Sequence, residues 1–197
     1  MQRTRAIRGR GALLLERASH AGFTLVELVV TLAVVAIIVS MAVPSFTGLM
    51  NSNRLTSQSN EIIAALQSAR MDAIRRNAPA YFCSSNNNAT CTNTSPWTGW
   101  IVYTDIDRDN TVDAGELLRT GTVRGTVSVV TSSAIKNNRV AFRPDGLARE
   151  GGVLLSGTFR ICMPVKLPAE NAREIAIGSG SRISTTSKAL SGACPAP

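Results

Sequence analysis

The chain has 197 residues, of which 44% are apolar and 17% charged, a composition that suits one modest globular domain with an appendage. Its formal net charge of +8 invites a nucleic-acid interpretation, but five of its 21 Lys and Arg lie in residues 1–22 beside one acid, Glu16. The other 175 residues keep 16 basic and 12 acidic side chains, a balance of +4, which excludes a strongly basic folded domain.

Residues 23–43 form an apolar stretch whose only charge is Glu27. At about 1.5 Å per residue a helix of this length matches the bilayer core of about 30 Å. The basic residues before the stretch predict a cytoplasmic leader and place everything after Pro44 outside. The alternative is a secretory signal peptide cut near Ser40, Met41 and Ala42, although such apolar regions have about 7–15 residues and no carboxylate.

The start of this stretch carries a specific motif, which runs Gly22-Phe23-Thr24-Leu25-Val26-Glu27 behind a short basic leader. It resembles the N-terminus of type IV pilin and type II secretion pseudopilin precursors. The resemblance implies that a prepilin peptidase cuts between Gly22 and Phe23, that Phe23 is then N-methylated, and that Glu27 is needed for assembly. It also implies other pilins and an inner-membrane assembly platform as partners.

The position of Glu27 needs a physical explanation, because a carboxylate at membrane depth costs about 2.5–3.5 kcal/mol on insertion scales. The dipole at a helix start returns only about 0.3–1 kcal/mol. A partner must therefore neutralise the charge, and the resemblance offers the ammonium of Phe23, from a neighbouring subunit or from the same chain. The alternative is a glutamate that reaches up to the membrane interface.

After the span the pattern stays helical and becomes amphipathic over residues 46–78. Pro44 and Gly48 predict a bend or a loosened turn at the junction of the two halves. The helix is expected to end near Asn77, since the residue before Pro79 disfavours helical geometry. The apolar positions expected to face the core are Leu55, Ile62, Ile63, Leu66, Ala69, Ala73 and Ile74.

Beyond Pro79 short strand patterns alternate with Gly, Asn, Pro and Ser clusters. Strands are expected at 80–83, 100–104, 116–120, 126–131, 139–142, 158–162, 174–177 and 182–185, with a turn at Pro144-Asp145-Gly146. Without helices between them these strands predict an antiparallel sheet or sandwich packed on the helix, an α+β fold. One of Trp97 and Trp100 is expected to pack on the sheet edge and the other to stay partly exposed.

This second part also carries a resemblance, through the strings "ALQSARMDAIRRNAPA", "GWIVYTDIDRD", "RVAFRPDG", "FRICMP" and "REIAIGSGSRIS". Together they are similar to the GspH/FimT branch of pseudopilins and minor pilins, over nearly the whole chain from Gly22. The expected organisation is a leader at 1–22, a transmembrane half-helix at 23–45, an amphipathic half-helix at 46–78 and a β-rich head at 79–197.

The four cysteines lack the CxxC spacings of zinc or thioredoxin-type sites, and they allow three pairings. If the head lies outside the cytoplasm, two sequential disulfides are favoured. These are a short loop closed by Cys83 and Cys91 and a tail held by Cys162 and Cys194. The alternative is four reduced thiols.

An acidic stretch carries the clearest pattern of ligands. Oxygen donors fall at the spacing of an EF-hand loop, at Asp105, Asp107, Asp109, Thr111 through its backbone, Asp113 and Glu116. The pattern predicts a Ca²⁺ site, although Asn110 replaces the usual glycine and the flanks are strands. The alternative is a hairpin loop in which Asp and Asn only serve turn geometry.

Basic residues near the C-terminus, among them Arg173, Arg182 and Lys188, are candidates for contacts with a nucleic-acid backbone. FimT-like minor pilins bind DNA through a tail motif of glycine, arginine, any residue, arginine. Only Arg182 matches an arginine in the corresponding stretch of this chain, so solvated surface charge is the favoured interpretation.

Enzymatic activity is not expected. The only histidine, His20, lies in the leader, and the chain has no Ser/His/Asp or Cys/His set, Gly-rich phosphate loop or zinc spacing. We therefore expect a minor pilin or pseudopilin in the inner membrane, with its head in the periplasm before it joins a filament. The alternatives are a DNA-uptake receptor and a free extracytoplasmic Ca²⁺-binding module.

Overall fold

The structure is a computed structural model that describes residues 22–197, except for the side chains of residues 41–44 and 179. The leader predicted at 1–22, with His20 and the basic residues before it, therefore lies outside the described residues apart from Gly22. The chain divides into two compact units, Met1–Ala42 and Val43–Pro197, which are described separately below. The single long helix α1 (Leu25–Arg76) contributes to both units, and the bend predicted at Pro44 falls at their boundary and stays a prediction.

Within the second unit, α1 presents one stripe of side chains to the head. Leu55, Ile62, Leu66, Ala69 and Ala73 have no exposed surface, and they recur at steps of seven, four, three and four. Ile74, which the sequence pattern assigned to the same stripe, is 49% exposed, because it falls one position after Ala73 and turns away from the core. The helix ends close to the predicted Asn77, whose left-handed φ of 52° reverses the chain.

The strands form two antiparallel sheets. The first has the order β3-β2-β1-β5-β6-β7 and the second the order β10-β9-β8-β4. The bounds are β1 Ala80–Ser84, β2 Gly99–Thr104, β3 Leu117–Thr122, β4 Ser128–Thr131, β5 Arg139–Phe142, β6 Ala148–Glu150, β7 Val153–Leu154, β8 Gly157–Cys162, β9 Ala172–Ile177 and β10 Ile183–Lys188. Two short 3₁₀ turns, η1 (Lys136–Asn138) and η2 (Ser179–Ser181), complete the head.

The fold is α+β, as the sequence predicts, and the eight predicted strands correspond to β1–β5 and β8–β10. The sequence interpretation missed β6 and β7, which have only three and two residues. They form a hairpin through Gly151 and Gly152, both at positive φ, so the Gly-Gly pair was the signal available for it. The predicted Pro144 turn thus joins β5 to β6 rather than to a later strand.

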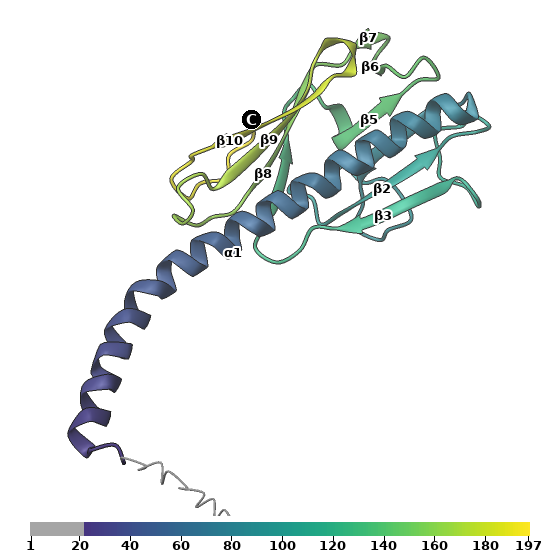
Figure 1. Cartoon of the computed structure of the whole chain (residues 1–197). Helices are drawn as coiled ribbons and strands as arrows, with labels where there is room; N and C mark the ends of the chain where they lie inside the picture. The colour runs from purple at the N-terminus through teal and green to yellow at the C-terminus, as the bar shows by residue number, and fades with distance from the viewer. Residues whose placement is uncertain (1–21) are drawn as a thin grey trace, which may run out of the picture. The chain divides into compact units, whose positions relative to one another are not determined.

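The larger of two hydrophobic clusters joins the helix to both sheets, and Figure 1 shows the outer part of α1 lying across them. At its centre Phe82 of β1 packs against Trp97, Trp100 and Phe159 of β8, with ring centroids 5.3, 5.6 and 5.7 Å away. The expectation that one tryptophan stays partly exposed is wrong: both are 2% exposed. Trp97 reaches the core because its backbone N–H donates to Val129 of β4, which draws its loop in from the edge.

The C-terminal tail after β10 is fastened to the second sheet although it has no regular structure. Asn171 donates to the carbonyls of Met163 and Ala193 and accepts the N–H of Leu190, and a disulfide joins Cys162 to Cys194. Arg160 pairs with Glu174 and donates to the carbonyls of Pro195 and Ala196.

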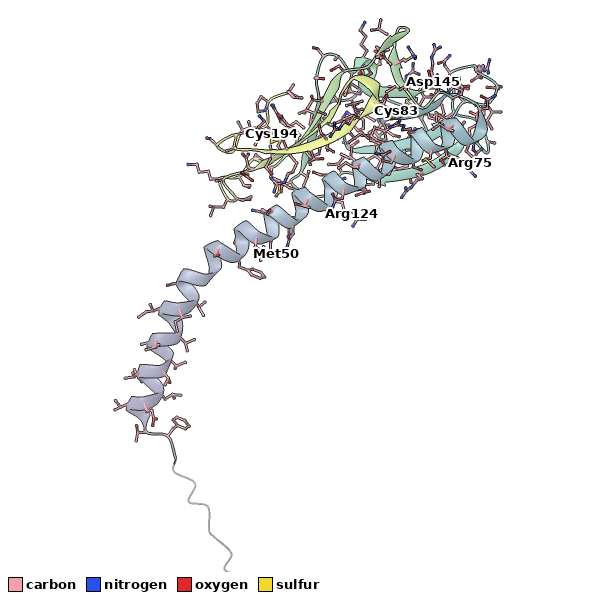
Figure 2. The ribbon with its side chains drawn as sticks, turned by 45° about the horizontal axis from the view of Figure 1, so that its top comes forward. Met50, Arg75, Cys83, Arg124, Asp145 and Cys194 are labelled. Carbon is pink, nitrogen blue, oxygen red and sulfur yellow. A yellow bond between two sulfur atoms is a disulfide. The ribbon has the colours of Figure 1, made fainter. Side chains whose placement is uncertain are left out.

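The second disulfide joins Cys83 of β1 to Cys91 and closes the polar loop between β1 and β2. Figure 2 labels Cys83 inside the head and Cys194 beside the C-terminal strand. The structure thus contains the two sequential pairs favoured by the sequence, and the described residues include no free cysteine.

Candidate functional site

The start of α1 is built by Thr24 and Glu27, three residues apart. The side-chain oxygen of Thr24 accepts the N–H of Glu27 at 3.2 Å, and its carbonyl accepts the N–H of Leu28. Thr24 is therefore the N-cap, and Glu27 is the third helical residue, whose backbone N–H the Thr24 side chain satisfies. This local chemistry fixes the helix start two residues after Phe23 and places the carboxylate in the first turn.

The part of α1 that belongs to the first unit shows apolar side chains on all sides. Every residue from 23 to 40 is exposed, and large apolar side chains such as Leu25, Val30 and Ile37 keep 55–78% of their surface accessible. Figure 2 shows these side chains projecting all around the helix. A helix that is apolar all round requires an apolar environment, and among the described residues α1 alone is long and apolar enough to cross a membrane.

Glu27 is the one charged residue within this apolar surface. Its side chain is exposed and makes no hydrogen bond or ion pair to any other described residue, apart from its backbone contact with Thr24. The predicted processing residues Gly22 and Phe23 precede the helix, and Phe23 is 80% exposed. The carboxylate is thus exposed at the surface of the helix.

The acidic stretch predicted to bind Ca²⁺ forms the connection between β2 and β3. Carboxylate oxygens of Asp105, Asp107 and Asp109 lie within 4.8 Å of one another. Asp113 and Glu116 lie outside this group, and the Thr111 hydroxyl donates to Asp109. The structure therefore assembles half of the predicted ligand set.

The basic residues predicted as a nucleic-acid surface are not assembled into one patch. Arg182 and Lys188 are exposed but lie at opposite ends of β10, about 20 Å apart at about 3.3 Å per residue. Arg173 is used inside the fold, since it donates to the carbonyls of Glu170 and Ala172 and to the hydroxyl of Ser52 on α1.

A cavity that the sequence interpretation missed lies beside the acidic loop and holds about 600 Å³. Its lining includes Tyr81, Arg108, Arg139, Arg143 and Arg149. Burial, and then the charge of Asp105, raises the pKa of Tyr81, while Arg139 and Arg143 oppose that rise. Arg139 and Arg143 alternate with Ala141 along β5 and its end, a period of two that was the available signal.

Comparison with known protein families shows to which family the chain belongs. A family described as "Type II transport protein GspH" matches residues 58–181, which is more than half of the chain. The chain belongs to the GspH family. A second family, the prokaryotic N-terminal methylation motif, matches residues 17–43, which include Gly22, Phe23 and Glu27. The chain is therefore a minor pilin or pseudopilin, a structural subunit of a type IV pilus or of a type II secretion pseudopilus that assembles with other subunits of this class.

Solved structures similar to this GspH-family chain include the type IV minor pilin FimU of Pseudomonas aeruginosa, with 21% identity and a TM-score of 0.48. The match covers 68% of this chain and 90% of FimU. The minor pseudopilin EpsH of the type 2 secretion system of Vibrio cholerae matches with 7% identity and a TM-score of 0.48, over 68% of this chain and 97% of EpsH. A search of curated proteins finds no match.

Proposed function

We propose that the GspH-family chain is made as an inner-membrane precursor, cut by a prepilin peptidase between Gly22 and Phe23 and methylated at Phe23, and then drawn into the filament by α1. In this proposal the basic leader stays in the cytoplasm, residues 23–43 span the membrane, and the disulfide-bonded head lies in the periplasm. The methylation motif matched at residues 17–43 and the exposed apolar surface of α1 support this sequence of events.

One observation carries the proposed assembly step: Glu27 stands in the first turn of an apolar helix, exposed and without a partner among the described residues. Membrane depth costs such a carboxylate about 2.5–3.5 kcal/mol, while the helix dipole returns about 0.3–1 kcal/mol. The remaining deficit of about 2 kcal/mol has to be met by an opposite charge. The methylated ammonium of Phe23 is such a charge, and it arises only after cleavage.

The same arithmetic favours a neighbouring subunit as the source of that ammonium. Helices that stack with the wrong axial offset leave both Glu27 and the ammonium unpaired in an apolar environment. Each wrong offset therefore carries the desolvation cost of two unpaired charges. Apolar packing along α1 does not by itself fix the axial offset between neighbouring helices, because apolar side chains contact lipid tails as favourably as they contact one another. Glu27 would therefore select the register in which subunits stack.

The test is to express Glu27→Ala, Glu27→Gln and Glu27→Asp chains with their native partners and to measure three quantities for each. These are the mass of the mature N-terminus, the membrane-bound fraction, and co-purification with other pilins. We expect all variants to be cut before Phe23 and to remain in the membrane. Ala and Gln should lower co-assembly by about tenfold or more, which corresponds to about 1.4 kcal/mol, and Asp should retain most of it.

The Glu27→Gln chain is the matched control for size and polarity, because it keeps the length of the side chain and a polar end group but loses the charge. Normal incorporation of Glu27→Gln would show that charge pairing does not control assembly. A mature N-terminus anywhere other than Phe23 would overturn the processing step, including the alternative cut near Ser40. The DNA-receptor alternative is not proposed, because its candidate residues are spread apart or used within the fold.

A further inference from the structure

The connection between β2 and β3 gathers negative charge at one end of the first sheet. Its base is closed by the N–H of Thr104 donating to the carbonyl of Glu116 at 3.0 Å. Carboxylate oxygens of Asp105, Asp107 and Asp109 lie within 4.8 Å of one another, and only Asp105 of the three is buried. Carboxylates this close repel each other, and a cation between them would relieve that repulsion.

Asp105 gives an independent reason to expect a cation. The residue is 1% exposed, and its Oδ2 accepts the N–H of Asn110 from within the loop at 3.2 Å. Its Oδ1 is buried and has no hydrogen-bond partner. A buried carboxylate oxygen without a partner is costly, because it has lost water and gained nothing in exchange. The Tyr81 hydroxyl also lies near this carboxylate, but it donates its hydrogen to Asn110 Oδ1. Since Asp107 and Asp109 lie close as well, a cation is the partner that would offset the buried charge of Asp105.

The other acids of the loop have different tasks. Glu116 is 5% exposed, and its two carboxylate oxygens accept the N–H of Ile106 at 2.6 Å and of Asp113 at 3.1 Å. It therefore ties the two arms of the loop together and acts as a positioning residue. Asp113 is exposed, and the charge of Asp109, followed by desolvation and by Asp107 and Glu116, raises the pKa of its carboxyl. The loop interior thus has a negative potential that reaches beyond the three gathered aspartates.

We propose that Asp105, Asp107 and Asp109 are the carboxylate ligands of a Ca²⁺ ion, which binds at the unpartnered Oδ1 of Asp105. This set is smaller than the EF-hand spacing predicts, because Asp113 and Glu116 are not ligands. Backbone carbonyls of the loop and water supply the other oxygens, since Ca²⁺ takes 6–8 of them at about 2.3–2.6 Å. Two oxygens on opposite sides of such an ion lie up to about 5.2 Å apart. The separations in the loop, all within 4.8 Å, are compatible with this limit.

The ligand chemistry selects the type of cation. The group contains only carboxylates and no histidine or cysteine, which disfavours zinc and other transition metals. Mg²⁺ demands near-ideal octahedral geometry at about 2.0–2.1 Å and releases its water reluctantly, whereas Ca²⁺ accepts irregular loops with exposed ligands. The ion would fix the turn between β2 and β3, and would hold Asp105 against the end of β1, where its N–H already donates to Pro79 at 2.9 Å.

The experiment uses Tb³⁺ as a luminescent probe for Ca²⁺, with the full chain in detergent. Tyr81 is a built-in antenna, because its hydroxyl donates to Asn110 Oδ1 at 3.2 Å and its ring stacks on Tyr103 at 4.9 Å. We expect tyrosine-sensitised Tb³⁺ emission that Ca²⁺ displaces, and a higher melting temperature in Ca²⁺ than in a chelator. Emission that Ca²⁺ does not displace at about 1 mM, the weak end of extracellular Ca²⁺ sites, would overturn the proposal.

The variants separate the proposed ligands from the rest of the loop. Asp107→Asn and Asp109→Asn change exposed side chains, so the fold should persist, and each should weaken Tb³⁺ binding by more than about tenfold. Asp113→Asn is the matched control, since it removes one charge from the same loop outside the group, and should change binding less than about threefold. If Asp113→Asn weakens binding as much as Asp107→Asn does, the EF-hand set is right and the proposed one is wrong. Binding by Asp107→Asn and Asp109→Asn equal to that of the unsubstituted chain would rule out a site in this loop.

Discussion

The aromatic cluster around Phe82 offers a quantitative test of how the head is held together. Phe82 has no exposed surface, and its ring meets Trp97 and Trp100 on its own side of the core and Phe159 in the other sheet. Replacing a buried phenylalanine by alanine costs about 3–5 kcal/mol through lost burial and the cavity that remains. Phe82→Leu keeps most of the apolar volume but loses three aromatic pairs of about 0.5–1.5 kcal/mol each, so we expect a loss of about 2–3 kcal/mol.

The measurement is urea unfolding of the full chain in detergent, followed by tryptophan fluorescence. Trp97 and Trp100 are the only tryptophans and both belong to the cluster, so the signal reports the region that is changed. With a slope of about 2 kcal/mol per molar urea, Phe82→Leu should lower the midpoint by about 1–1.5 M and Phe82→Ala by about 2 M. Phe46→Leu is the matched control, because Phe46 is 64% exposed and its loss should stay within about 0.5 kcal/mol. A Phe82→Leu midpoint equal to that of Phe46→Leu would refute the view that this cluster joins the sheets.

Two further predictions concern the first sheet. Gly121→Ala should destabilise the head by about 1–3 kcal/mol in the same unfolding measurement, because a Cβ there would lie 2.3 Å from the buried ring of Trp100; unchanged stability would show that the ring can move aside. Burial raises the pKa of Tyr103 to about 12, above the ordinary value of 10.0, so the unfolded chain loses that proton first. Tyr103 should therefore contribute its full stability below pH 10 and lose that contribution as the pH rises toward 12. In a pH series of unfolding midpoints, Tyr103→Phe should make this decline less steep. An unchanged slope would contradict the raised pKa of Tyr103.

The sequence predicted the elements whose patterns are local and strong. The apolar steps of Leu55, Ile62 and Leu66 predict the buried face of α1, and the strand segments beyond Pro79 predict the antiparallel class of the head. The position of Ile74 was predicted wrongly because Ala73 and Ile74 are adjacent, and the spacing of the apolar residues fits either of them. Only the packing of the folded chain decides that Ala73 is buried and Ile74 is exposed. The division of the strands into two sheets is a matter of long-range pairing that no local pattern contains.

The candidate site was also predicted only in part, because some of its features are local in the sequence and others depend on the folded chain. The motif around Glu27 is continuous in the chain, and its capping geometry at Thr24 follows from residues three positions apart. The ligand spacing from Asp105 to Glu116 is also local, but which side chains meet depends on hydrogen bonds such as those of Glu116 to Ile106 and Asp113. The alternation of Arg139 and Arg143 is visible in the sequence, but the cavity also takes its lining from other strands and turns, which only the folded chain brings together.

The fastened C-terminal tail has a practical consequence for labelling this protein. Arg160, Asn171 and Cys194 hold the last residues against β8 and β9, so a fluorescent or affinity label added after Pro197 is attached to a segment that these contacts tether. The hairpin turn at Gly151 and Gly152 is a better place, because both residues are exposed and no neighbouring atom lies within 4 Å of a Cβ built on either. An epitope inserted there would report on the head from outside while leaving the end of the chain in its native setting.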